Sequence, residues 1–432
     1  MKLVGNMEVK DNVLFIGGVS TLDLAKEFKT PLYVIDEKLV RSQCRRYYEA
    51  FKVKECGNKV AYAGKAFLTM SMCQIVNSEG LNLDVVSGGE LYTALKSGFP
   101  AKNIYFHGNN KTIEEIEMGI NLGVGRFVVD NFYELEKINY IALQKNVVQK
   151  VLLRITPGIE AHTHDYIKTG QIDSKFGFTL PNDDAIKAVK KALTLPNIQL
   201  EGLHCHIGSQ IFEIEPYERE VEIMLSFIGR IKDELNYEIE ELDLGGGFGI
   251  YYKEGDKPQK VEKFCESILN KAEDAAKSIG IKLPILVIEP GRSIIGNAGT
   301  TLYTVGSIKE IENIRKYVSV DGGMTDNIRP SLYNAEYECV IANNVENTLK
   351  DKVAIAGKCC ESGDILLNDI TISKPESGDI LAVFTTGAYG YSMSSNYNKI
   401  PKPAVVMVKD GENKLICRRQ SFEQIVEDEI LL

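Results

Sequence analysis

The chain has 432 residues, 44% hydrophobic and 25% charged, which is enough for a large core and about two average domains. Its formal net charge of −10 argues against nucleic acid or an anionic membrane as a general partner. Residues 1–6 lack the apolar core of a signal peptide, and no apolar run is long enough to span a membrane. The nine scattered cysteines lack disulfide or Cys-x-x-Cys spacing, so we expect a protein of the reducing cytoplasm.

The first two thirds of the chain repeat a short β-rich run followed by a helix-like segment. The first five runs recur roughly every 22–24 residues, a spacing typical of strands joined by crossover helices. Eight such units favour a closed (β/α)8 barrel of the TIM type, with chemistry at the carboxyl ends of its strands. An open doubly wound sheet is the alternative, but its glycine-rich turn usually follows the first strand, and here the glycines come late. The predicted strands are 59–63, 82–86, 104–107, 126–130, 151–155, 202–207, 241–244 and 285–289.

The pattern changes from about residue 296 onward. Short alternating runs bounded by Gly, Asn and Asp predict a mostly antiparallel β domain. Residues 31–35 are also strand-like, and we expect them to pair with the C-terminal sheet. The predicted division is therefore a barrel at 38–290 and a β-sandwich or barrel-like domain built from 1–37 and 291–432.

Two glycine turns follow late barrel strands. Residues 243–247 read Asp-Leu-Gly-Gly-Gly, and residues 289–292 read Glu-Pro-Gly-Arg. Glycine lets backbone N–H groups approach an anion closely, so both turns are candidates for binding a phosphate. Either motif alone is more simply an ordinary tight turn. Because both follow strands and the second carries a carboxylate and a guanidinium, together they favour a site for a charged, phosphorylated heterocycle.

Lys65 lies directly after the first predicted barrel strand. A lysine at a strand's carboxyl end can point into the barrel mouth, where partial desolvation would free its amine for Schiff-base chemistry. A solvated surface lysine is the alternative interpretation. Lys65 lies at the same end of the predicted barrel as the glycine turns, and this position favours a role in Schiff-base chemistry over that of a solvated surface lysine.

His204 and His206 lie in the sixth predicted strand, where alternation puts both side chains on one face. The pair could bind a metal together with His162 or His164. Alternatively, one histidine could stack on a planar ring while Ser209 contacts a phosphate. A pair of buried core histidines is the third possibility. Metal-dependent barrel hydrolases tend to carry such a pair on the first strand, and this one is on the sixth.

Four residues of the C-terminal segment could carry chemistry. Arg329 offers a bidentate fork that could bind a carboxylate together with Tyr333. Tyr389 lies in a glycine-flanked turn where its phenol could reach a phosphate. Cys360 could act as an acid, although a lone cysteine is more often a buried apolar thiol. A solvated arginine and a packing tyrosine are the simpler interpretations of Arg329 and Tyr389.

Taken in chain order, these motifs resemble those of the pyridoxal-phosphate-dependent decarboxylases with an alanine-racemase-like barrel, most closely the diaminopimelate decarboxylases. The resemblance covers nearly the whole chain and is highly specific for the superfamily. One departure is Phe67, where the family commonly has Asn, and we expect local repacking there without loss of chemistry. The motifs that carry the resemblance are residues 62–66, 107–111, 155–158, 174–177, 204–210, 245–247, 289–292 and 360–364.

The resemblance implies pyridoxal 5'-phosphate as the cofactor. It implies that Lys65 forms the Schiff base, that His206 stacks on the pyridine ring, and that Glu289 hydrogen-bonds the ring nitrogen. A carboxylate there keeps the ring protonated, and a pyridinium is the better electron sink. The other implied cofactor contacts are Asp84, Ser209, Gly246, Gly247, Gly291, Arg292 and Tyr389.

The resemblance also implies roles toward the substrate. Cys360, supplied by the partner subunit of a homodimer, reprotonates the α-carbon after CO2 leaves. Glu361 binds a distal ammonium, and the side chains implied for a distal carboxylate are Arg292, Arg329 and Tyr333, with Tyr389 nearby. This set of charges suits a substrate with an amino-acid group at each end. The expected reaction is therefore meso-2,6-diaminopimelate to L-lysine and CO2, the last step of lysine biosynthesis.

Three other functions remain open. A related decarboxylase could act on a polyamine precursor or a modified amino acid. A catalytically silent regulatory homologue is a second possibility, but such a protein would not need both Lys65 and Cys360. A metal-dependent hydrolase is the third. We expect no metal, no nucleic acid and no membrane as partners.

Overall fold

The computed structural model describes residues 2–159 and 173–432. It divides into two compact units, a barrel unit (Gln43–Gly249 and Lys257–Ser293) and a β unit (Met1–Ser42, Ile250–Asp256 and Ile294–Leu432). His162 and His164, the additional metal ligands considered above, lie outside the described residues. None of the described helices is both long enough and apolar enough to cross a membrane.

Eight parallel strands of the barrel unit close on themselves. Each strand pairs with the next along the chain, and the last pairs with the first. This closure confirms the (β/α)8 barrel, and the open doubly wound alternative is wrong because it would leave the first strand unpaired on one side. The strands are β5 (Lys59–Ala63), β6 (Asn82–Val85), β7 (Ile104–Phe106), β8 (Arg126–Val129), β9 (Gln149–Thr156), β11 (Ile198–His204), β12 (Glu241–Asp243) and β13 (Ile285–Ile288). A short strand, β10 (Phe178–Thr179), adds to β9.

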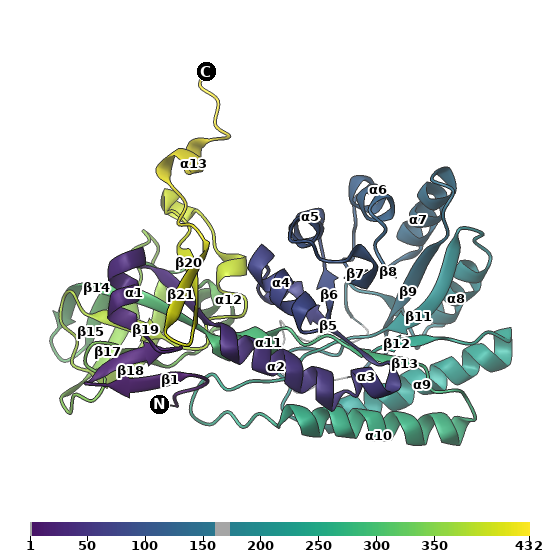
Figure 1. Cartoon of the computed structure of the whole chain (residues 1–432), viewed down its shortest axis with the longest axis horizontal. Coiled ribbons are helices and arrows are strands. Elements are labelled where there is room, and N and C mark those ends of the chain that lie inside the picture. Colours follow the sequence, from purple (N-terminus) through teal and green to yellow (C-terminus); the bar gives the residue numbers. More distant parts are fainter. Residues whose placement is uncertain (1, 160–172) are drawn as a thin grey trace. The chain divides into compact units, whose positions relative to one another are not determined.

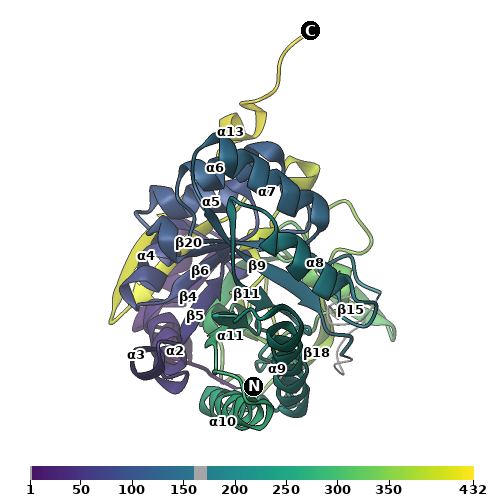
Figure 2. The same cartoon turned by 90° about the vertical axis from the view of Figure 1, so that its right-hand side faces the viewer.

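Helices surround these strands, as the end-on view shows (Figure 2). The helices after the first four strands each begin at a polar side chain that accepts a backbone N–H of the first turn, namely Thr69, Ser87, Thr112 and Asn131. These caps end the strand-to-helix loops and turn the chain back along the barrel. The helices are α2 (Glu37–Ala50), α3 (Val53–Cys56), α4 (Met70–Ser78), α5 (Gly88–Lys96), α6 (Ile113–Asn121), α7 (Phe132–Gln144), α8 (Asp184–Leu193), α9 (Glu215–Leu235) and α10 (Val261–Ile279).

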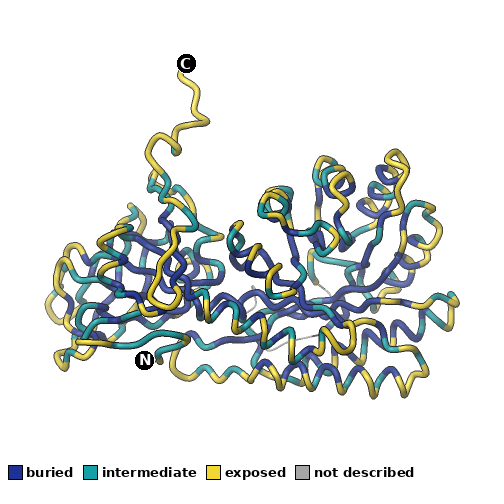
Figure 3. Tube along the Cα trace, in the orientation of Figure 1, coloured by how far each residue is buried: buried dark blue, intermediate teal, exposed yellow. Residues whose placement is uncertain are grey.

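The barrel strands are buried along most of their length, whereas the surrounding helices alternate buried and exposed positions (Figure 3). One side chain from each of five strands meets in the barrel interior, so the interior is a packed core and not a pore. These side chains are Ala61, Tyr105, Val128, Leu152 and Val287.

A network of ion pairs occupies the amino-terminal end of the strands, and we call it the basal network. Arg126 Nε lies 2.8 Å from Glu201 Oε2 and 3.1 Å from Glu241 Oε1. Lys150 Nζ lies 2.7 Å from Glu201 Oε1, and Lys59 pairs with Glu241. The Tyr105 hydroxyl donates to Glu241 Oε1 at 2.7 Å. The basal network comprises Lys59, Tyr105, Arg126, Lys150, Glu201 and Glu241.

The β unit is a mixed but mostly antiparallel sheet with strands from both chain ends (Figure 1). As predicted, the early strand β4 (Leu32–Asp36) lies within it, antiparallel to β14 (Gly299–Ile311) and parallel to β20 (Ala404–Lys409). The other strands are β15 (Arg315–Val320), β16 (Cys339–Ile341), β17 (Lys350–Ala356), β18 (Ile365–Ser373), β19 (Ile380–Val383) and β21 (Glu412–Cys417). A small sheet of β1 (Met7–Lys10), β2 (Val13–Ile16) and β3 (Val19–Ser20) and the helices α1 (Thr21–Phe28), α11 (Arg292–Ile295), α12 (Arg329–Tyr333) and α13 (Phe422–Val426) complete the chain.

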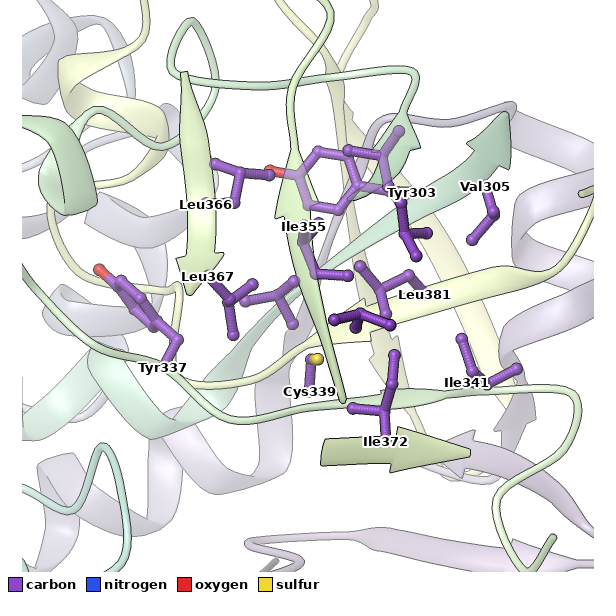
Figure 4. Packing of buried hydrophobic residues seen from close by; sticks show 14 of the residues in the cluster. Tyr303, Val305, Tyr337, Cys339, Ile341, Ile355, Leu366, Leu367, Ile372 and Leu381 are labelled. Carbon is purple, nitrogen blue, oxygen red and sulfur yellow. The ribbon is translucent and has the colours of Figure 1, made fainter. Parts of the chain in front are cut away.

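The core of the β unit is built from side chains of several of these strands. Figure 4 shows Tyr303, Ile355 and Leu381 packed together with Leu366, Leu367 and their neighbours. Alternate residues of the strands face this core, which is the pattern that led to the prediction of a β domain.

Candidate active site

Three polar side chains meet where barrel strands end. Glu289 follows β13 directly, His107 follows β7 directly, and His204 is the last residue of β11. His107 Nε2 lies 2.7 Å from Glu289 Oε1, and His204 Nε2 lies 3.3 Å from Glu289 Oε2. The two imidazole rings contact each other edge to face with centroids 4.9 Å apart. All three side chains are buried. Each carboxylate oxygen of Glu289 therefore faces the ring nitrogen of one histidine, as the two distances show.

Two more carboxyl groups lie in the same region. Burial raises the pKa of Asp84, in β6, to about 6, even though His107 opposes the shift. Burial, and then the charge of Glu289, raise the pKa of Asp243, the last residue of β12, well above its usual value. Burial acts in the same direction on Glu289, but His107 and His204 outweigh it and hold the pKa of Glu289 well below its usual value. Of the three buried carboxyls, Glu289 is therefore the one most strongly held as an anion.

Lys65 lies in a short 3-10 turn (Gly64–Ala66) directly after β5. Its side chain is exposed, so the desolvation expected from the sequence is not provided by the surrounding protein. Its charge still reaches the barrel mouth, because it lowers the pKa values of both Asp84 and His206. Lys65 thus lies at the correct end of the strand, with its amine accessible.

His206 lies beyond the end of β11, since that strand ends at His204. The predicted strand was therefore too long, and the two histidines have different partners. The backbone N–H of Gly246 donates to His206 Nδ1 at 3.2 Å, which leaves the ring proton on Nε2. Burial lowers the pKa of His206 well below its usual value, so the ring is neutral.

The glycine turn after β12 packs tightly against its neighbours. Gly245 and Gly247 have φ values of +63° and +102°, which favour glycine over other residues. A Cβ on Gly246 would lie 2.1 Å from the carbonyl oxygen of Glu289. Glycine is therefore needed here to bring the turn against the end of β13, whatever it binds.

Ser209, Gly291 and Arg292 come together beside this turn. Arg292 Nη2 donates to Ser209 Oγ at 2.9 Å. A Cβ on Gly291 would lie 2.9 Å from Cβ of Ala63, so the turn after β13 sits directly against the end of β5. A hydroxyl, a guanidinium and two glycine turns at the carboxyl end of a barrel form a suitable setting for a phosphate.

In the β unit, Arg329 is buried among tyrosines. Its Nη1 donates to the hydroxyl of Tyr337 at 2.7 Å and to that of Tyr252 at 3.2 Å. The guanidinium also lies 5.9 Å from the ring centre of Tyr389. Burial opposes the charge of Arg329, but the tyrosines raise its pKa above the usual value. Arg329 is therefore a permanent buried cation that donates to the hydroxyls of Tyr252 and Tyr337.

Tyr389 has a φ of +60°, which is uncommon for a residue with a side chain. Such backbone conformations concentrate at functional sites, because only the surrounding structure can hold them. Tyr333, at the end of α12, is partly buried.

Cys360 and Glu361 are both exposed, in the loop between β17 and β18. The buried Asp364 carboxylate fixes this loop, since it accepts the backbone N–H of Met324 at 2.6 Å and of Cys359 at 2.8 Å. The Cys360 N–H in turn donates to Asn398 Oδ1 at 2.8 Å. The cysteine and the glutamate are thus held in an ordered, accessible loop.

Known proteins resemble this chain over almost its whole length. Residues 37–296 match the family described as "Pyridoxal-dependent decarboxylase, pyridoxal binding domain". The diaminopimelate decarboxylase of Bacillus methanolicus is 53% identical, over 94% of each chain, and that of Bacillus subtilis is 51% identical, over 96% of this chain and 94% of the relative. The crystal structure of the M. jannaschii diaminopimelate decarboxylase in co-complex with L-lysine matches with a TM-score of 0.93 and 38% identity, covering 99% of this chain and 98% of that one.

The chain belongs to the diaminopimelate decarboxylase family. The family expectation drawn from its motifs is thereby confirmed, and so is the expectation of pyridoxal phosphate as the cofactor. The residues at the barrel mouth fit this cofactor. Glu289 is an anion that a protonated ring nitrogen would match, and Ser209 with Arg292 and the glycine turns can receive a phosphate.

The sequence analysis gave no role to several residues that lie at this site. His107 was recognised as part of a motif without a role, yet it follows a barrel strand just as Lys65 follows another. That common position could have singled it out. Asp243 was recognised as the start of a glycine motif without a role of its own, and Arg154 was not considered. The pKa of Asp243 is raised well above its usual value, and Arg154 lowers the pKa of Asp84. Tyr252 and Tyr337 could not be predicted as partners of Arg329, because nothing in the sequence relates them to it.

Proposed function

We propose that this protein decarboxylates meso-2,6-diaminopimelate to give L-lysine and CO2, the last step of lysine biosynthesis. The observation that carries the proposal is Glu289, a buried carboxylate held ionised at the mouth of the barrel. Near-full-length identity to diaminopimelate decarboxylases supports the choice of substrate.

We assign the cofactor contacts as follows. Lys65 attaches the cofactor, His206 stacks on its ring, and Glu289 binds its ring nitrogen. When bound, pyridoxal phosphate supplies the electron sink for the carbon that loses CO2. Asp84 lies near the attachment point, and the phosphate contacts are Ser209, Gly246, Gly247, Gly291, Arg292 and Tyr389. The tight packing of the glycine turns and the Arg292–Ser209 hydrogen bond support this assignment.

We assign the substrate contacts on the same basis. Cys360 delivers a proton to the α-carbon, and Glu361 binds the distal ammonium. The distal carboxylate is bound by Arg292, Arg329 and Tyr333, with Tyr389 beside them. We propose a homodimer in which Cys360 and Glu361 come from the partner subunit, and their exposure in an ordered loop supports this arrangement.

We further propose that the enzyme acts in the cytoplasm and has no nucleic-acid partner. All nine cysteines are free, which suits a reducing compartment. The functional division into a barrel at 38–290 and a β domain from 1–37 and 291–432 stays a prediction.

The assay that tests this function uses purified protein with pyridoxal phosphate and meso-diaminopimelate, and quantifies CO2 and L-lysine. Parallel reactions contain ornithine, arginine or lysine. Equal amounts of lysine and CO2 from meso-diaminopimelate alone are the expected result. Activity on one of the other amino acids would overturn the substrate assignment, because those substrates lack a distal carboxylate.

Arg329 provides a sharper test of substrate choice. Arg329→Ala should raise the KM for meso-diaminopimelate by roughly tenfold or more, since a charge-assisted hydrogen bond to the distal carboxylate is lost. Tyr337→Phe is the matched control, because it removes one hydroxyl from the guanidinium and keeps the cation. An unchanged KM in a folded Arg329→Ala protein would count against recognition of a distal carboxylate.

A further inference from the structure

Two histidines contact the one carboxylate to which the proposed function gives a role toward the cofactor ring. His107 and His204 come from β7 and β11, strands that are not neighbours in the barrel, and they approach different oxygens of Glu289. Both rings are buried. Among the described residues, His204 Nδ1 has no hydrogen-bond partner, and the close pair of His107 Nε2 and Glu289 Oε1 is not aligned as a hydrogen bond. Because both rings are buried, the two histidines contact Glu289 and not solvent.

We infer that His107 and His204 are positioning residues that donate hydrogen bonds to Glu289, so that this side chain stays ionised and held in the orientation in which it would bind the ring nitrogen of the cofactor. The inference rests on the proposed contact between Glu289 and the ring nitrogen. A buried carboxylate loses its hydrogen bonds to water and stays ionised only where donors of the protein replace them. The two imidazoles provide one donor for each oxygen.

The consequence concerns where a proton resides. A carboxylate and a ring nitrogen in contact share one proton, and burial alone favours the neutral carboxylic acid. In that state the ring is an uncharged pyridine and a poorer electron sink. Donors to Glu289 stabilise its anion, so the proton stays on nitrogen and the ring keeps its positive charge.

The neighbouring acids support this arrangement. Asp243 lies beside Glu289 and its pKa is raised well above its usual value, first by burial and then by the charge of Glu289. Its Oδ1 accepts the backbone N–H of Gly245 at 2.9 Å. The raised pKa of Asp243 lessens the second negative charge next to Glu289. Of the buried carboxyls in this cluster, Glu289 is the one most strongly held as an anion, at the place where the ring nitrogen is expected.

A bound cation is the competing explanation for this cluster. Ligand atoms of His107, His204, Asp243 and Glu289 lie within 4.8 Å of one another. A metal needs the lone pair of each ring nitrogen that faces it, whereas a hydrogen bond to Glu289 needs a proton on the same nitrogen. His204 Nε2 is aligned with Glu289 Oε2 as a hydrogen bond at 3.3 Å, and His107 Nε2 lies 2.7 Å from Oε1 as a close charge contact that is not aligned as a hydrogen bond. The direct contacts favour proton-mediated pairing with Glu289.

The experiment reconstitutes the full-length protein with ring-nitrogen-labelled pyridoxal phosphate and measures the NMR shift of that nitrogen, together with the Kd of the cofactor. The variants are His107→Leu and His204→Leu, which lose the donor, and His107→Gln, whose amide replaces a donor near the position of Nε2. Tyr105→Phe is the packing control, since it removes a polar group from β7 two residues before His107 and at the other end of the barrel.

We expect a protonated ring nitrogen in the wild type, in His107→Gln and in Tyr105→Phe. In His107→Leu the nitrogen should shift toward the unprotonated value, with kcat lower by roughly tenfold to 100-fold and KM little changed, as for loss of a hydrogen bond to a buried charge. His204→Leu should show a smaller effect, because its contact with Glu289 is longer, at 3.3 Å.

The outcomes separate this inference from the proposed function. If Glu289→Gln leaves the nitrogen shift unchanged, the role of Glu289 itself is wrong. If Glu289→Gln moves the shift but both leucine variants keep the wild-type value, only the positioning role is wrong. A stoichiometric metal in the wild-type protein that both leucine variants lack would replace the hydrogen bonds by a metal site.

Discussion

The two ends of the same barrel treat buried charge in opposite ways. In the basal network, Glu201 and Glu241 each contact two cations, and Glu241 also accepts the hydroxyl of Tyr105. At the carboxyl end, Asp84, Asp243 and Glu289 share a small volume with two histidines. Among the described side chains, Oδ2 of Asp243 and Nδ1 of His204 have no hydrogen-bond partner, whereas Arg126 Nε and Glu201 Oε2 of the basal network, which also lack an aligned hydrogen bond, face each other as an ion pair at 2.8 Å.

The difference separates charges that hold the fold from charges that do chemistry. At the amino-terminal end each carboxylate of the network contacts cations, and such pairing stabilises the barrel. Carboxyls that crowd together without enough donors acquire shifted pKa values, and such shifts concentrate at functional sites. In (β/α)8 barrels the carboxyl end carries the chemistry, and the opposite end carries stability.

The two lysines of β5 and its following turn give the largest expected contrast. Lys65→Ala should lower turnover of meso-diaminopimelate by about 10³-fold or more, since it removes the amine that attaches the cofactor. Lys59→Ala, at the start of the same strand, should leave turnover per folded molecule unchanged. Its free energy of unfolding should fall by about 1–3 kcal/mol, because Glu241 loses one cation. Lysine production and urea unfolding measure the two effects, and near-wild-type turnover of Lys65→Ala would contradict the proposed mechanism.

The same substitution on neighbouring strands gives the second contrast. Glu289→Gln, at the end of β13, should lower kcat by about 10²-fold, because the charge that matches the ring nitrogen is lost. Glu241→Gln, at the start of β12, should preserve kcat and destabilise the protein by about 3 kcal/mol, because it leaves Arg126 and Lys59 poorly paired. Steady-state kinetics and denaturant unfolding of both variants test this. An equal loss of kcat in the two variants would contradict the distinction between a catalytic and a stabilising end of the barrel.

Glu220 on α9 is a buried carboxyl without an ion-pair partner among the described residues, and it shows what burial alone does to stability. Burial raises the pKa of Glu220 to about 8 from a usual value of 4.5. Between these values the folded protein keeps a proton that the unfolded chain releases, so this group makes stability fall as pH rises toward and past 8. Glu220→Gln stays neutral and should be more stable than the wild type by about 1–3 kcal/mol near pH 9. Thermal unfolding at several pH values measures this, and parallel curves for the two proteins would show that Glu220 is not protonated in the fold.

The smallest effect concerns a single hydroxyl of the basal network. Tyr105→Phe removes the hydrogen bond to Glu241 but keeps the aromatic ring beneath the Arg126 guanidinium, which lies 5.2 Å from the ring centre. The free energy of unfolding should fall by about 1 kcal/mol with unchanged kcat. Urea titration resolves a change of this size. A loss of kcat instead would mean that the two ends of the barrel are coupled.

The sequence predicted the barrel well because its strands are local features. Each predicted barrel strand coincides with an observed one, since short apolar runs at regular spacing depend only on nearby residues. The sixth strand was drawn too far, because the apolar Ile207 continues the pattern after the strand has ended at His204. Strand ends depend on pairing with neighbours and are harder to locate.

Contacts between distant residues could not be predicted from one sequence. Arg126 meets Glu241 across the barrel, and Arg329 meets Tyr252, which is far from it in the chain. The two glycine turns could be recognised from the sequence because glycine marks a backbone requirement on its own. The tyrosines that contact Arg329 carry no such mark, so Tyr252 and Tyr337 could not be predicted, and the role of Tyr333 toward a carboxylate stays a prediction.

The pairing of β4 with β14 and β20 has a consequence for how the chain matures during synthesis. Leu32 leaves the ribosome early, but its partner Ala404 follows roughly 370 residues later, which at typical rates of synthesis is a delay of roughly 20 s or longer. All the barrel strands are synthesised before Ala404, so the barrel unit can fold before the pairing of β4 is complete. Until β14 is made, the apolar residues 32–35 remain an unpaired strand, and one side of β4 stays unpaired until β20 follows. Unpaired strands of this kind associate readily with other chains. The first strand of the large β sheet to be synthesised is thus among the last to be completed.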